Sequence, residues 1–200
     1  MTGTIASRAE RRAREKSATR ALILKAARVV AARDGARNLS LRGVAGEAGF
    51  APAALYGYFR SKDELLLALA AEDLSGVARA MRSATHEALG DRGLAAASAL
   101  ALAFLRDTET LAAASAALPS ISGASEAERL FNGRLIQVLT ALSDAVGQKA
   151  DSRAQQGDVV VLAAALTGLA IMGRTGRLEA LGFSADELLA RLEARFARAL

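Results

Sequence analysis

Apolar residues recur along this chain at every third or fourth position, which is the spacing of an amphipathic helix. Nowhere do they alternate with the period of two that marks a half-buried strand. The sequence therefore predicts an all-α fold. The expected helices cover about 17–34, 40–48, 52–58, 61–89, 94–106, 111–118, 125–147 and 155–174, with a last one from residue 184, and 61–89 reads equally as one long helix or two.

Two of these helices are short, and a glycine turn joins them. Ser40 can cap the first, because its hydroxyl can accept a free backbone N–H. Gly49 supplies the turn, since glycine takes left-handed backbone angles at little cost. Pro52 falls in the first turn of the second helix, where no N–H donor is needed. The order helix, glycine turn, short helix is that of the helix-turn-helix motif, whose second helix enters the major groove of DNA.

The second short helix has one apolar side, formed by Leu55 and Phe59. These residues lie four apart and therefore point the same way, into a small core shared with the preceding helices. Three later helix starts carry Ser followed three positions on by Glu, which is the capping-box pattern. These pairs are Ser61 with Glu64, Ser125 with Glu128, and Ser184 with Glu187.

The net charge of +5 is spread unevenly over the 200 residues. Residues 1–62 contain 13 Lys and Arg against 4 Asp and Glu, a net charge of +9, whereas residues 63–200 carry −4. A basic amino-terminal third on an acidic body indicates a head that binds a polyanion. A basic segment that merely keeps the protein soluble would give the same imbalance.

Residues 1–16 form an arginine-rich arm that lacks an apolar stripe and is predicted to be flexible. Its cations are Arg8, Arg11, Arg12, Arg14 and Lys16. Read as a disordered tail, the arm has no partner. Read as part of a DNA-binding head, it lies along phosphates or reaches into a minor groove.

The composition argues against an enzyme and against a metal site. There is no cysteine and only one histidine, His86, which removes disulfides, cysteine-based zinc sites and most nucleophile–base pairs. The sequence contains neither a glycine-rich phosphate loop nor an H-E-x-x-H pattern. We therefore expect no catalytic residues, no metal and no cofactor.

The amino terminus is polar and basic, without the apolar core of a signal peptide. The longest apolar run, 159–172, is shorter than the roughly 20 residues that a membrane span needs. The sequence thus predicts a cytoplasmic protein that does not enter a membrane.

Over residues 17–70 the sequence resembles the TetR family of bacterial transcriptional repressors. Four linked stretches carry the resemblance at the family's spacing: a long first helix ending in glycine, a second helix with A-x-x-A-G, a short helix with L-Y-x-[HY]-F, and S-K-x-x-L. They stand here as Arg33-Asp34-Gly35, Ala45 and Ala48-Gly49, Leu55-Tyr56-Gly57-Tyr58-Phe59, and Ser61-Lys62-Asp63-Glu64-Leu65.

The resemblance implies a homodimer that binds a palindromic operator in double-stranded DNA. It also implies a pocket for a small ligand in a larger carboxy-terminal domain. Because the central helices are mainly apolar, we expect the ligand to be apolar as well. The expected division is a flexible arm over 1–16, a DNA-binding domain over 17–62 with its motif at about 40–59, and a helical regulatory and dimerisation domain over 63–200. The two last helices would join the copies, although their apolar stripes would serve equally well for packing within one chain.

The resemblance also assigns DNA contacts. Arg42 would reach a base edge or a phosphate, and Ser40 and Lys62 would bind phosphates. The second helix departs from the family because Ala51 replaces the usual Ser or Thr, which leaves little hydrogen-bonding capacity for reading bases. The full set of expected DNA-binding residues is Ser40, Arg42, Pro52, Ala53, Ala54, Tyr56, Tyr58 and Lys62.

Large apolar residues on the central helices are candidates for the ligand pocket, and packing alone would explain them equally well. These residues are Phe104, Leu105, Phe131, Leu135 and Met172, with His86 and Arg106 as possible polar contacts. Two other functions stay open. One is an architectural protein that coats DNA without sequence preference, which agrees with the low hydrogen-bonding capacity of the second helix. The other is a helical dimer without DNA function, which agrees with the apolar stripes of the last helices.

Overall fold

Every regular element in the described part of the chain is helical, which confirms the all-α fold. The computed structural model describes residues 7–88, 92–117, 125–147 and 153–198, and these residues contain no strand. The elements in chain order are α1 (Arg8–Asp34), η1 (Ala36–Asn38), α2 (Leu41–Ala48), α3 (Pro52–Leu55), α4 (Lys62–Glu87), α5 (Gly93–Asp107), α6 (Glu109–Ala117), α7 (Glu126–Val146), α8 (Arg153–Arg174), α9 (Arg177–Ala180) and α10 (Ala185–Arg198).

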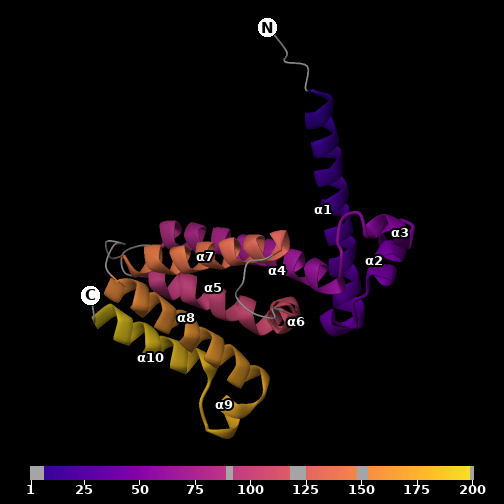
Figure 1. The fold of residues 1–200 in the computed structure, drawn as a ribbon. Helices are drawn as coiled ribbons and strands as arrows, with labels where there is room; N and C mark the ends of the chain where they lie inside the picture. The colour runs from indigo at the N-terminus through magenta and orange to yellow at the C-terminus, as the bar shows by residue number, and fades with distance from the viewer. Residues whose placement is uncertain (1–6, 89–91, 118–124, 148–152, 199–200) are drawn as a thin grey trace.

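A small head is built from α1, α2, α3 and the start of α4. Figure 1 shows α2 and α3 on the side of α1 that faces away from the other helices. The head has its own apolar core, in which the expected pair Leu55 and Phe59 is fully buried. The other large buried members are Ile23, Leu24, Val30, Leu39, Leu41, Val44, Leu65 and Leu69.

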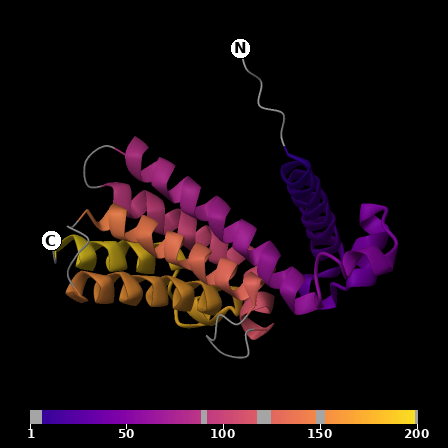
Figure 2. The ribbon, with the colours of Figure 1, turned by 45° about the horizontal axis from the view of Figure 1, so that its top comes forward.

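A single helix, α4, connects the head to the body. The pattern over 61–89 is therefore one long helix and not two. It contributes Leu65 to the core of the head, Leu66 to a cluster at the junction and Met81 to the core of the body. Because α4 packs in all three, a tilt of this helix would move the head relative to the body. The body itself consists of α5–α10, with α4 and α7 lying against each other along much of their length (Figures 1 and 2).

The first helix begins earlier than predicted. The structure places Arg8–Lys16 in α1, so the prediction of a flexible arm is wrong for these residues, while residues 1–6 lie outside the described chain. The physical reason is a capping box. The backbone N–H of Glu10 donates to the Ser7 hydroxyl at 3.2 Å, and the Glu10 carboxylate accepts the Ser7 N–H at 2.7 Å.

Two further differences concern short helices. The second helix of the motif ends at Leu55 and not at residue 58, because Gly57 follows and residues 56–58 form a turn. A short helix, α9, occupies part of the segment between 174 and 184 where none was predicted. It follows Gly176, which has a φ of 67°, and it buries Leu178. The breaks expected at Gly90 and Pro119 fall outside the described residues.

Helix α8 has two apolar sides. Val159, Leu162 and Leu166 are buried in the core of the body, whereas Val160 and Ile171 on the other side are more than half exposed. In the described chain, α8 is the one helix long and apolar enough to cross a membrane. The apolar run 159–172 alone predicts a segment too short for this. Only 22% of its most apolar window is buried, so the chain leaves an apolar surface of α8 uncovered.

Candidate nucleic-acid interface

Helix α2 begins as the sequence predicted. The Ser40 hydroxyl accepts the backbone N–H of Gly43 at 3.1 Å, which caps the helix. Arg42 lies in the first turn of α2 with its side chain exposed. Because α2 buries Val44 and Ala45 in the head, its capped end is fixed and Arg42 projects into solvent.

The turn after α2 is the predicted glycine turn. Gly49 has a φ of 72°, and the backbone N–H of Phe50 donates to the carbonyl of Ala45 at 2.9 Å. Helix α3 then starts after Ala51, whose side chain cannot cap it, with Pro52 in its first turn. The absence of a side-chain cap that the sequence predicted is therefore confirmed.

Burial divides the short helix α3 and the turn that follows it into two sides. Leu55 and Phe59 have no exposed surface, whereas Tyr56 is 60% exposed. Tyr58 is half-buried against the core of the head. Pro52, Ala53 and Ala54 are all exposed, and together with Tyr56 and Arg42 they give the head an uncovered face.

Lys62 has a partner that the sequence did not reveal. Its ammonium group donates a hydrogen bond to the backbone carbonyl of Arg37, 25 residues earlier. A cation in the first turn of a helix opposes the helix dipole, and this carbonyl offsets part of that cost. An ammonium group has three donors, so Lys62 keeps hydrogen bonds available for a phosphate.

The capping box expected at Ser61 is formed on one side only. The N–H of Glu64 donates to the Ser61 hydroxyl at 3.1 Å. The Glu64 carboxylate, however, accepts the N–H of Arg60 at 2.6 Å and does not return to Ser61. Of the other two expected boxes, the one at Ser125 is complete, whereas at Ser184 the structure shows the Glu187 N–H bond to the serine.

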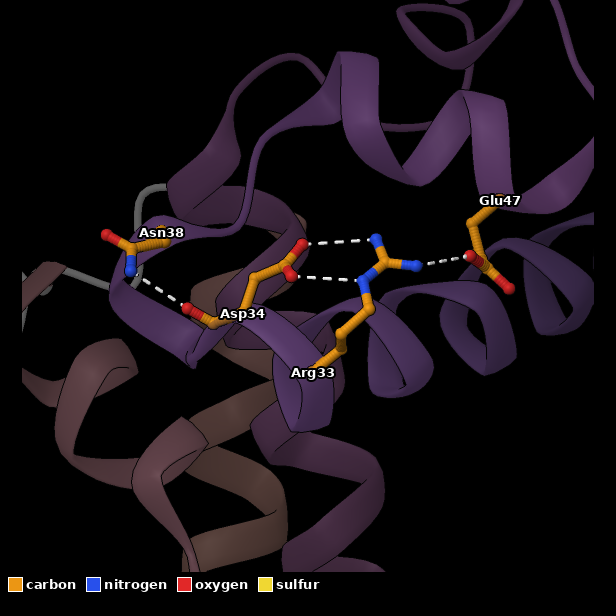
Figure 3. Close-up of polar contacts among 4 residues, drawn as sticks. All are labelled: Arg33, Asp34, Asn38 and Glu47. Carbon is orange, nitrogen blue, oxygen red and sulfur yellow. Dashed lines mark hydrogen bonds and ion pairs between the residues drawn. The ribbon is translucent and has the colours of Figure 1, made fainter.

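Arg33 holds the end of α1 against α2. Its guanidinium donates to both carboxylate oxygens of Asp34, at 3.0 and 3.1 Å, and to Glu47 at 3.1 Å (Figure 3). The hydrogen bond from Arg33 lowers the pKa of Asp34 below its ordinary value. The stability that this bond contributes is therefore present at neutral pH and is lost as the pH falls through that lowered pKa. The groups are largely exposed, so we expect the contribution to be small.

A polar cleft of about 1220 Å³ separates α1 from the body. Across it, Arg28 of α1 pairs with Asp73 of α4 at 2.6 Å and with Glu72 at 3.2 Å. The Thr110 hydroxyl of α6 donates to the same Asp73 carboxylate at 2.8 Å. These bonds tie the head to α4 and α6, in addition to the apolar cluster at the junction.

The body contains an apolar pocket of about 540 Å³ between α4, α5, α6, α7 and α8. Four of the predicted residues, Phe104, Leu105, Phe131 and Leu135, line it. Met172 packs against the core of the body without lining this pocket, and neither His86 nor Arg106 lines it. The sequence missed the polar groups that do line it, which include Thr108, Asn132 and Arg174. Their spacing along the chain gave no signal, because α5, α7 and α8 meet only in the folded protein.

The expected dimerisation stripes behave differently on the two helices. On α10, Leu188, Leu192 and Phe196 are half-buried and pack against the chain's own core. The predicted stripe on α8 is the uncovered side of that helix. Its members are Val160, Ala164, Thr167 and Ile171, all exposed, and Val161 lies beside them.

A capped helix, a glycine turn and a second helix with one buried and one bare side define the head as a helix-turn-helix DNA-binding domain, carried on a helical body. The model of the bacterial regulatory proteins of the TetR family matches residues 23–69, which span this head. The head therefore belongs to the TetR family of bacterial regulatory proteins.

Solved structures share the fold over nearly the whole chain. A protein of unknown function from Rhodococcus sp. RHA1 is 26% identical, with a TM-score of 0.69 over 91% of this chain and 95% of that chain. A TetR-family regulatory protein from Rhodococcus RHA1 is 20% identical, with a TM-score of 0.58 over 90% and 95%. FadR from Bacillus subtilis, in complex with stearoyl-CoA, is 17% identical, with a TM-score of 0.60 over 88% and 96%. No curated protein matches the sequence.

Proposed function

We propose that this regulator is a cytoplasmic repressor that binds a palindromic operator as a homodimer and is released by a small apolar ligand. Residues 17–62 would form the DNA-binding domain, and residues 63–200 the regulatory and dimerisation domain. The observation that carries the proposal is the two-sidedness of α3 and the turn that follows it. Leu55 and Phe59 are buried on one side, whereas Tyr56, Ala53 and Ala54 are exposed on the other. This division presents one face of a basic head to a groove.

The exposed residues of the head suggest separate roles in binding. Arg42 is the one long cation in the first turn of α2, and its guanidinium can form two hydrogen bonds with guanine. Ala53 and Ala54 can contact thymine methyl groups, with Pro52 beside them. Phosphate contacts, which position the head without reading sequence, would come from Ser40, Tyr56, Tyr58 and Lys62.

A pair of substitutions tests these roles on a duplex selected from a random pool and on a scrambled duplex. Arg42→Ala is expected to lower the preference for the selected duplex by about tenfold, since a good base contact is worth roughly 1–3 kcal/mol. Lys62→Ala is expected to weaken both duplexes equally and to lower the slope of log K against log salt by about one. Titrations at several salt concentrations measure both effects.

The control for this pair is Arg153→Ala, an exposed arginine at the start of α8, a helix of the body. Melting curves should accompany Lys62→Ala, because this residue also bonds to the Arg37 carbonyl within the head. Equal losses on the two duplexes for Arg42→Ala would refute its contact with a base.

Dimerisation is supported by the uncovered apolar side of α8. A second copy placed on a twofold axis would cover Val160 and its neighbours, and α10 lies next to α8 to complete a bundle of two helices from each copy. Two heads joined in this way would read half-sites about 34 Å apart, or a multiple of that distance.

The apolar pocket supports regulation by a ligand. Its wall is mainly apolar, with a few polar groups such as Asn132 and Arg174, which is the usual character of a small-molecule site. FadR from Bacillus subtilis, which shares the fold, is in complex with stearoyl-CoA, so an acyl chain is a suitable first probe. Because α4 lines this pocket and also enters the head, a ligand that favours another tilt of α4 would change the separation of the heads.

Filling the pocket is expected to abolish the response to ligand without weakening DNA binding. Ala163→Phe places a ring in the cavity from α8, so added stearoyl-CoA or stearic acid should no longer release the selected duplex. Fluorescence anisotropy of the duplex during titration with each probe measures the release. Ala80→Phe, at an exposed position of α4 outside the pocket, is the control and should respond like the parent protein. Release of the Ala163→Phe protein at the parent concentration of probe would contradict this location.

One observation favours a second function. The exposed residues of α3 are proline and alanines, which cannot form side-chain hydrogen bonds with bases. A protein with such a helix could coat DNA without reading its sequence. Equal affinity for the selected and scrambled duplexes would select this function in place of the repressor.

A further inference from the structure

The amino-terminal half of α1 projects from the head. Residues 8–22, which we call the α1 extension, contain no buried side chain, whereas five residues of α1 between Ile23 and Val30 are buried. Figures 1 and 2 show from two directions that this half of the helix rises clear of the head and of the body. Packing within the chain therefore does not explain why the helix continues so far.

The charge of the α1 extension is strongly positive. Six cations stand against two acids, and the Glu10 carboxylate is occupied by the capping bond to Ser7. In the described chain, none of these six cations takes part in an ion pair, and the innermost, Arg20, lies over the ring of Phe59 at 4.9 Å. The cations are Arg8, Arg11, Arg12, Arg14, Lys16 and Arg20.

The positions of these cations oppose the stability of the free helix. Arg8 and Arg11 lie in the first turns of α1, where the helix dipole disfavours positive charge. The extension also gains nothing from tertiary packing, which supplies most of the stability of helices in proteins. A polyanion alongside the extension would remove both costs, by neutralising the repelled cations and by giving the helix a surface to lie on.

The direction of the extension suggests where that polyanion lies. In Figure 1 the start of α1 points away from α8, α9 and α10, and therefore away from the face on which we place the second copy. In a dimer on a palindrome, this direction leads outward from the operator centre. At 1.5 Å per residue the extension is roughly 22 Å long, which corresponds to about six base pairs of flanking duplex.

We propose that the α1 extension binds, as a cationic helix, the phosphate backbone of the DNA that flanks each half-site. The proposal rests on the proposed function, because it needs the head to be docked on DNA. It adds a contact outside the helix-turn-helix motif, one that strengthens binding without reading sequence.

The test compares two duplexes, one limited to the selected palindrome and one extended by ten base pairs at each end, with a scrambled version of each. Replacing Arg8, Arg11, Arg12 and Arg14 by Gln is expected to lower the salt slope on the extended duplexes by at least about two, because each phosphate no longer neutralised lowers it by about 0.9 and each of the two helices of the dimer loses at least one such contact. On the short duplexes the slope should not change. The matched control replaces four exposed arginines of the body by Gln, at Arg92, Arg106, Arg153 and Arg177, and should behave like the parent protein.

A second variant, Ser17→Pro, separates a helix from a flexible tail. Proline is tolerated in the first turn of a helix, so α1 can restart at residue 17, while the segment before it loses its direction. All cations remain, yet the slope on the extended duplexes should fall as it does for the four-arginine variant. Melting curves show whether the head of this variant is folded.

Three results would overturn the proposal. An unchanged slope for the four-arginine variant would remove the contact, and an equal fall on short and extended duplexes would place it inside the half-site. If the salt slope of Ser17→Pro on the extended duplexes equals that of the parent protein, the positive charge acts without the helix. If the selected and scrambled duplexes bind equally, the operator proposal fails, but the scrambled duplexes still test the extension because phosphate contacts do not depend on sequence.

Discussion

Replacing Phe59 by alanine is expected to unfold the head and abolish DNA binding while the body keeps its helices. Phe59 has no exposed surface and packs in the core of the head with Leu55 and the buried side of α1. Truncating a buried phenylalanine costs about 3–5 kcal/mol. A head this small buries little apolar surface in total, so such a loss is a large part of its stability.

Calorimetry or circular dichroism on heating would measure the loss in the Phe59→Ala protein. We expect the unfolding transition of the head to move to lower temperature, while that of the body, which has a separate core cluster, stays in place. Tyr56→Ala is the matched control, because Tyr56 is 60% exposed and its removal should change stability by no more than about 0.5 kcal/mol. The control should nevertheless bind DNA more weakly. Parent-like melting and DNA binding for Phe59→Ala would refute the division of α3 into a buried and a presented side.

Placing two carboxylates on the uncovered side of α8 is expected to have the second large effect. Val160→Glu with Ala164→Glu would put unpaired charges into an apolar interface, where burying an isolated charge is very unfavourable. The protein should become monomeric. Because the second head of a dimer binds at an effective concentration in the millimolar range, its loss should weaken binding to a palindrome by about a hundredfold or more.

Analytical ultracentrifugation and titration of the palindrome and a single half-site measure the two consequences. Affinity for the half-site should not change, since the head is untouched. The control places the same charges on an exposed part of α4, as Ala80→Glu with Ser83→Glu, and should remain dimeric. A dimer that persists in the α8 variant would show that the copies meet elsewhere, and a parent protein that is already monomeric would remove the dimer from the proposal.

The core of the motif could be predicted from sequence because its determinants are local. The Ser40 cap, the left-handed Gly49 and the uncapped start of α3 each depend on residues within a few positions of one another. The burial of Leu55 and Phe59 follows from their spacing on one turn of helix. The same kind of signal, Ser7 with Glu10, marked the true start of α1, and the flexible-arm prediction overlooked it because the segment has no apolar stripe.

What the sequence left open about the pocket and about α8 has a different origin. A helix such as α8 has apolar residues on two sides, and the sequence does not show which side the rest of the chain covers. The residues predicted as its stripe proved to be the uncovered ones, while Val159, Leu162 and Leu166 are buried. Met172 was likewise assigned to the pocket by its size and helix alone, although it packs elsewhere.

The sequence by itself determined most of the helices, the motif and the basic head, because caps, turns, spacing and charge are properties of neighbouring residues. The tertiary structure alone decided which carbonyl accepts the hydrogen bond from Lys62 and which carboxylates form ion pairs with Arg28. It also decided which residues line the pocket and which apolar side of α8 remains exposed. Each of these depends on a distance between residues far apart in the chain, and such a distance is fixed only when the helices pack against one another.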